Sequence, residues 1–258
     1  MLRFVLLFLL LAFAMAAPAQ DIPPRRTLAD TWTAMLKDHT REGAIDGVPL
    51  VAVDYAAIKS DPRWSLLLSK LATDPEPAER DARLAYWINA YNILAIEVVL
   101  KEYPVESIRD IGSLFKPVWK RPAGTVGGRE VTLDEIEHSI LRPMGEPRIH
   151  AAINCASVSC PDLRREAYTA SHLGAQLDEQ MHAWLANEQK GARLEPDGDL
   201  RVSWIFTHFQ EDFGGTDDAL VRFLTPYLPS DLASNVTPKT DIKAMDYDWS
   251  LNDTKRLS

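Results

Sequence analysis

Both cysteines of the chain lie in one short segment, residues 149–160, which reads IHAAINCASVSC. Cys155 and Cys160 are five positions apart, and His150 precedes Cys155 by the same interval. A cysteine becomes a nucleophile when a nearby base removes its proton, and a further polar group fixes the tautomer of that base. The segment therefore has the residue types of a thiol active site, but also those of a disulfide.

Geometry restricts how these residues can meet. A regular strand would place His150 and Cys155 on opposite faces, and a regular helix would separate them by about 140°. A disulfide needs Cα atoms about 4.4–6.8 Å apart, whereas five steps of strand span roughly 17 Å. Either use of the cysteines therefore requires a tight turn. A functional thiol at Cys155, a disulfide and a pair of inert buried cysteines remain open. We favour the functional thiol, with Cys160 as a structural residue near a helix start.

Two histidines are candidates for the base, His150 in the same segment and His138 in LDEIEHSILRP. The imidazole needs an orienting partner, and Glu137, Asn89 and Asn154 are the candidates. The predicted catalytic set is therefore Cys155, His150, His138, Glu137 and Asn89. The remaining histidines are expected to be ordinary core or surface residues: His39, His172, His182 and His208.

No metal and no cofactor is expected. The candidate zinc ligands would be His138, His150, Cys155 and Cys160. Their spacing matches no standard zinc finger or zinc ribbon. The chain also lacks a P-loop, a dinucleotide-binding glycine fingerprint, an HExxH motif and a GxSxG motif.

Residues 76–102 contain YWINAYNILAIEVVL and are apolar on nearly every side, which predicts a long, buried, central helix. Its two asparagines, Asn89 and Asn92, need partners, because an unpaired buried amide costs about 1–3 kcal/mol. They either tie down a loop or line a pocket. We predict that they lie close to residues 150–155 and that one of them hydrogen bonds there. Further pocket candidates are Asn92, Asn154 and Cys160.

The other elements predict an α+β fold, a helix-rich single domain with a small antiparallel sheet or hairpins. Apolar periodicity and capping signals predict helices at residues 28–37, 64–71, 132–141, 172–189, 206–213 and 218–224. Hairpins are expected around Gly128 and Gly198. RIHAAIN is compatible with a buried strand, a helix start is expected at Pro161, and the C-terminal DIKAMDYDWSLN is expected to be extended.

The first 19 residues have a basic start, an apolar stretch and small-residue cleavage sites after Ala16 and Ala19, which predicts a signal peptide. Residues 20–258 then form one globular domain in the periplasm or outside the cell, with no stable membrane anchor after cleavage. The net charge of −9 argues against a nucleic-acid partner. The ligand is expected to be an unidentified small molecule or peptide.

Several segments in order resemble exported bacterial members of domain of unknown function family 547: RLAYWINAYNILAIEVVL, TLDEIEHSILRP, PRIHAAINCASVSCPDLRREAYTA, EDFGG and YDWSLN. The resemblance covers about residues 81–252. It implies a cysteine-peptidase-like or transglutaminase-like fold and importance for Glu137, His138, His150 and Cys155, together with Asn89 and Asn92. Plant relatives carry serine in place of Cys160. The resemblance therefore implies that Cys155 alone matters more than the cysteine pair, which disfavours a disulfide.

Two classes of function follow from these residues. The first is an exported thiol-dependent hydrolase or acyltransferase, in which Cys155 attacks and a histidine acts as the base. The alternative is a protein without catalysis, either a periplasmic binding module for a small thiol or peptide or a structural protein with a disulfide. The environment of the Cys155 sulfur discriminates between them.

Overall fold

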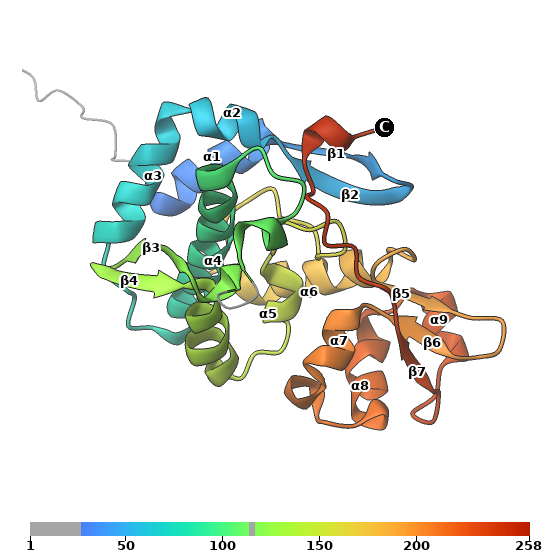
Figure 1. Cartoon of the computed structure of the whole chain (residues 1–258). Coiled ribbons are helices and arrows are strands. Elements are labelled where there is room, and N and C mark those ends of the chain that lie inside the picture. Colours follow the sequence, from blue (N-terminus) through green and yellow to red (C-terminus); the bar gives the residue numbers. More distant parts are fainter. Residues whose placement is uncertain (1–26, 114–116) are drawn as a thin grey trace, which may run out of the picture.

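The computed structural model describes residues 27–113 and 117–258 and is a helix-rich α+β domain (Figure 1). The predicted signal peptide, residues 1–19, lies outside the described residues. Among the residues described, no helix is both long and apolar enough to cross a membrane.

The predicted central helix is present as α4, Arg80–Glu102. It begins four residues after the predicted start, because the Glu79 side chain caps the backbone N–H groups of Asp81 and Ala82. It ends before Pro104, which has no N–H group with which to continue the helix. Most of its side chains are buried in the larger of two main hydrophobic clusters, which we call the large core.

Three helices and two hairpins surround α4 (Figure 1). The helices are α1, Leu28–His39; α2, Tyr55–Ser60; and α3, Pro62–Thr73. The predicted hairpin around Gly128 is confirmed as β3, Pro122–Val126, and β4, Arg129–Thr132. A second hairpin, β1 at Thr40–Ile45 and β2 at Val48–Val53, was not predicted. Its turn is Asp46-Gly47, and both residues have positive φ, as the Asp-Gly turns of two-residue hairpins require.

The C-terminal part has its own hydrophobic cluster, the small core. Its helices are α6, Leu173–Leu185; α7, Trp204–His208; α8, Asp217–Leu224; and α9, Ser230–Asn235. The predicted hairpin around Gly198 is confirmed as β5, Ala192–Leu194, and β6, Leu200–Val202. Strand β7, Ile242–Ala244, adds to β6 in parallel.

The segment before the cysteines is a helix, α5 at Ile149–Ala152, and the prediction of a strand there was wrong. A short apolar run does not distinguish a buried strand from a buried helical turn by periodicity. Helix α5 places Ile149 and Ala152 in the large core and Ala151 in the small core. The chain therefore enters the cysteine segment at the junction of the two cores.

The C-terminal segment is extended, as predicted, and crosses both parts of the molecule (Figure 1). Single bridges join Ser250 to Ser107 and Leu251 to Ser157. Asn252 accepts a hydrogen bond from the Tyr55 hydroxyl at 2.7 Å, which ties the segment to α2. This path carries Tyr247 and Trp249 to the junction of the cores.

Candidate functional site

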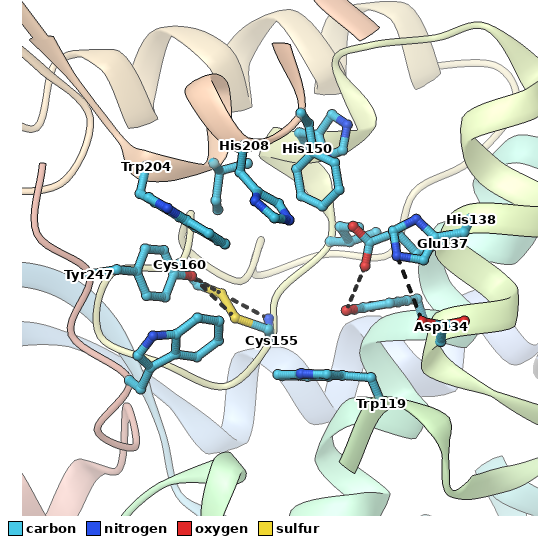
Figure 2. A pocket seen from close by; sticks show the side chains of 15 residues that line it. Trp119, Asp134, Glu137, His138, His150, Cys155, Cys160, Trp204, His208 and Tyr247 are labelled. Atoms are coloured by element: carbon cyan, nitrogen blue, oxygen red, sulfur yellow. Dashed lines mark hydrogen bonds and ion pairs between the residues drawn. A yellow bond between two sulfur atoms is a disulfide. The ribbon is translucent and has the colours of Figure 1, made fainter. Parts of the chain in front are cut away.

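A cavity of about 170 Å³ lies at this junction, and both cysteines are in its wall (Figure 2). It also contains four of the predicted site residues besides Cys155: Cys160, His150, His138 and Glu137. Aromatic rings form most of the remaining wall. They are Tyr91, Trp119, Trp204, Phe209, Tyr247 and Trp249.

The two cysteines form a disulfide with Cα atoms 6.2 Å apart. The structure therefore has no free thiol among the described residues, contrary to the expectation of a free Cys155. The tight turn that a disulfide requires is present, because Ala156 has a φ of 65° and Asn154 holds both ends of the loop. The Asn154 side chain accepts from the Ala156 N–H at 2.8 Å and donates to the Pro161 carbonyl at 2.7 Å. The chain around Pro161 is irregular, so the helix start predicted near Cys160 is also wrong.

The two sulfur atoms have different surroundings. Both residues line the cavity, but Cys160 is 2% exposed, whereas Cys155 is half-buried. Sγ of Cys160 accepts from the Cys155 backbone N–H at 2.9 Å and from the Tyr247 hydroxyl at 3.2 Å. Sγ of Cys155 lies 3.3 Å from each of the hydroxyl oxygens of Ser157 and Tyr247. The disulfide thus joins a more exposed cysteine to a buried one whose sulfur has two hydrogen-bond donors.

Helix α4 holds the cysteine segment in place through Asn92. The side-chain nitrogen of Asn92 donates to the Ala152 carbonyl at 2.9 Å, and its side-chain oxygen accepts from the Asn154 N–H at 2.8 Å. This confirms that one asparagine of α4 hydrogen bonds near Cys155. Asn89 instead pairs with both backbone groups of Tyr168. Neither asparagine, nor Asn154, lines the cavity.

Glu137 and His138 come from a π-helix over Glu135–Leu141, where the sequence predicted an ordinary helix. One hydrogen bond of the predicted capping box is present, because the Glu135 N–H donates to the Thr132 hydroxyl at 3.0 Å; the Glu135 side chain pairs with Arg129 instead. Glu137 accepts from the Tyr91 hydroxyl at 3.3 Å. Burial raises the pKa of Glu137 to about 7, although Tyr91 and a nearby arginine oppose the shift. This carboxyl group can therefore give or take a proton near neutral pH.

His150 is buried, and its Nε2 lies 2.7 Å from Oδ2 of Asp212. Its ring stacks on Phe209 with centroids 4.5 Å apart. Burial lowers the pKa of His150, so the neutral imidazole donates its N–H to the carboxylate. Asp212 also accepts two hydrogen bonds from Arg142 at 2.6 and 2.8 Å. None of the described histidines hydrogen bonds to either cysteine sulfur.

Two further histidines line the cavity. Nε2 of His138 lies 3.8 Å from Asp134, and its Nδ1 contacts the Arg142 guanidinium at 3.1 Å. His208, expected to be an ordinary residue, stacks on Trp204 with centroids 4.1 Å apart. Burial lowers the pKa of both imidazoles. Among the residues described, no group of three or more His, Cys, Asp or Glu side chains could hold a metal ion.

Most residues of the aromatic wall were not predicted from the sequence. Trp119, Trp204 and Trp249 lie in three separate segments, and no local spacing links them. The C-terminal YDWSLN motif was the one available signal, because it concentrates Tyr247 and Trp249 in an extended polar stretch. Folding brings the three tryptophans and Tyr247 together beside the disulfide.

Comparison with known proteins gives one match. No curated protein and no solved structure matches the chain. A family model described as "Protein of unknown function, DUF547" matches residues 75–185, which include α4, the π-helix and the cysteine segment. This range contains three of the five segments that carried the resemblance, whereas EDFGG and YDWSLN lie outside it. The match identifies residues 75–185 as a DUF547 region.

Proposed function

We propose that this pocket carries out thiol–disulfide exchange between the Cys155–Cys160 disulfide and a small thiol. The observation that supports this most directly is the asymmetry of the two sulfurs. Both cysteines line the cavity, but Cys155 is the more exposed of the two, whereas Cys160 is buried and its sulfur accepts two hydrogen bonds. Exchange requires one sulfur that can be attacked and another that leaves as a stabilised thiolate.

In the first step, the thiolate of the incoming molecule attacks Sγ of Cys155, and the bond between the cysteine sulfurs breaks. Its electron pair goes to Sγ of Cys160, which leaves as a thiolate. The Cys155 N–H and the Tyr247 hydroxyl point at that sulfur and stabilise its charge. Burial raises the pKa of Tyr247, which keeps its hydroxyl protonated as a donor.

The remaining steps complete the balance. A second thiolate attacks the small molecule's sulfur in the mixed disulfide. A small disulfide forms and is released, Sγ of Cys155 leaves as a thiolate, and both cysteines are then reduced. Another disulfide compound restores the oxidised pair by the reverse exchange. Glu137 lines the same cavity and titrates at about 7, so its carboxylate accepts the proton of an incoming thiol.

The test compares Cys160→Ser, which leaves only Cys155, with Cys155→Ser, which leaves only Cys160. Both folded variants are treated with a small disulfide, and mass spectrometry follows the mixed disulfide. We expect Cys155 to react at least about 10-fold faster, because a thiol must be accessible to react and Cys155 is the more exposed cysteine. In denaturant the two rates should converge, which is the control. A wild-type disulfide that thiols reduce only after unfolding would contradict exchange and favour a structural disulfide.

A thiol-dependent hydrolase or acyltransferase is a second candidate, because three histidines line the pocket beside Cys155. It requires reduction of the disulfide and movement of an imidazole, since His150 is bound to Asp212. Reduced protein given an activated ester should then show a burst of released alcohol that Cys155→Ser abolishes. A non-catalytic binding module would bind a small thiol or peptide in the same cavity without either reaction.

A further inference from the structure

We infer that the thiol taken by this pocket carries an ammonium group, so that the substrate is a small aminothiol. This rests on the proposed exchange at Cys155 and names its substrate class. Three features support it: the charge of the cavity, the aromatic character of its wall, and the separation of its sulfur from its carboxylates.

The described part of the cavity wall has carboxyl groups and no permanent cation. Asp134 and Glu137 line it, whereas none of its described lining residues is lysine or arginine. Its three imidazoles have lowered pKa values and are neutral at pH 7. Arg142, the nearby arginine, is neutralised by Asp212, to which it donates two hydrogen bonds. A positively charged ligand is therefore favoured over an anionic one.

Aromatic rings supply the second feature. The ring of Trp249 lies 6.0 Å from that of Trp119, 6.1 Å from that of Trp204 and 4.4 Å from that of Tyr247. Rings grouped in this way attract organic ammonium ions through their negative faces. Trp249 already binds one cation, because the Arg109 guanidinium lies 5.2 Å from the ring centre.

The third feature is the placement of these groups around the cavity. Figure 2 shows the disulfide on one side, Asp134 and Glu137 on the other, and Trp119 beneath the space between them. A ligand whose sulfur meets Cys155 therefore directs its other end at the carboxylates. A cavity of about 170 Å³ suits a small ligand with a few heavy atoms between sulfur and nitrogen.

The experiment measures reduction of the folded, oxidised wild-type protein by three thiols of similar size. These are cysteamine, which is cationic, mercaptoethanol, which is neutral, and mercaptoacetate, which is anionic. Rates are divided by thiolate concentration and corrected for thiol nucleophilicity, since both depend on thiol pKa. We expect cysteamine to react about 10-fold faster than mercaptoethanol and mercaptoacetate to be slowest, as for a cation paired with a partly desolvated carboxylate.

Variants locate the preference. Asp134→Asn should reduce the advantage of cysteamine about threefold or more by removing one carboxylate. Asp231→Asn is the matched control, because this exposed carboxylate is on α9 and outside the cavity. It changes the net charge equally and should leave the advantage unchanged. S-methylcysteamine, which cannot exchange, should quench tryptophan fluorescence saturably and compete with cysteamine.

The outcomes separate this inference from the proposed function. Equal corrected rates for the three thiols, with rapid reduction, would overturn the aminothiol preference and leave exchange intact. The rate advantage of cysteamine could also fall equally in Asp231→Asn and Asp134→Asn. That result would overturn the aminothiol preference, because attraction by the net charge of the protein would explain it. Failure of every thiol to reduce the folded protein would overturn the exchange reaction itself.

Discussion

Two sets of buried polar groups in this molecule differ in how fully the protein uses them. Asn89 and Asn92 on α4 direct both the oxygen and the nitrogen of each amide at backbone groups. Glu137 accepts from Tyr91 and otherwise faces the cavity, where burial raises its pKa to about 7. A polar group with all its hydrogen bonds matched by the backbone fixes the structure. A polar group that has unused hydrogen-bonding capacity and faces a cavity is available to interact with a ligand.

The largest expected effect is that of Asn92→Leu. It leaves the Ala152 carbonyl and the Asn154 N–H buried without their partner, which should cost about 3–5 kcal/mol of unfolding free energy. Urea unfolding measures the loss. Asn235→Leu is the control, because this exposed asparagine ends α9 and should change stability by less than about 0.5 kcal/mol. If Asn92→Leu lowers the free energy of unfolding by less than about 1 kcal/mol, Asn92 does not have the structural role that separates it from Glu137.

Asn89→Leu should cost somewhat less, about 2–4 kcal/mol, because it frees the two backbone groups of Tyr168 but leaves the cysteine loop tied. At temperatures where the variant is folded, its rate of disulfide reduction should equal that of wild type. Asn92→Leu should change that rate, since Asn92 holds Asn154 next to Cys155. Equal effects of both variants on reduction would show that α4 controls the pocket as a whole.

Glu137→Gln tests the pocket side of the comparison through pH. A raised pKa means that the folded protein holds this proton more tightly than the unfolded chain. The protonated Glu137 side chain therefore contributes to the free energy of unfolding. This contribution is complete below the ordinary glutamate pKa of 4.5 and is lost as pH rises through about 7. Between pH 5 and 8, wild type should lose about 2 kcal/mol more than Glu137→Gln. Urea unfolding at both pH values measures this, and parallel profiles would mean that Glu137 is ionised throughout.

Tyr247→Phe should have the smallest effect, and only on chemistry. Loss of the hydroxyl removes one of the two donors to Cys160 and should slow thiol reduction about 10-fold, since a hydrogen bond to a charged sulfur is worth about 1.5 kcal/mol. Tyr227→Phe is the control, because this tyrosine follows α8 and lies outside the cavity. If Tyr247→Phe reduces stability but not the rate, Tyr247 belongs with the asparagines as a structural group.

Local signals predicted much of the fold. The apolar run of α4, the hairpins at Gly128 and Gly198, and the cap at Thr132 depend on interactions within a few residues of each other. The turn at Asp46-Gly47 carried an equally local signal, so the β1–β2 hairpin was predictable although it was not predicted. The strand predicted at residues 148–154 was wrong, because contacts with both cores decide the conformation of a short apolar segment.

For the site, the sequence by itself determined the residue types: two cysteines five positions apart, a Glu-His pair, and asparagines in an apolar helix that must find partners. The tertiary structure decided how they are used. Asn154 bends the loop so that the cysteines join, and Asp212, from a segment 62 positions away, binds His150. Tyr247 reaches the sulfurs on a C-terminal segment that crosses both cores. Such contacts depend on the packing of distant segments, which no periodicity or spacing in the chain specifies.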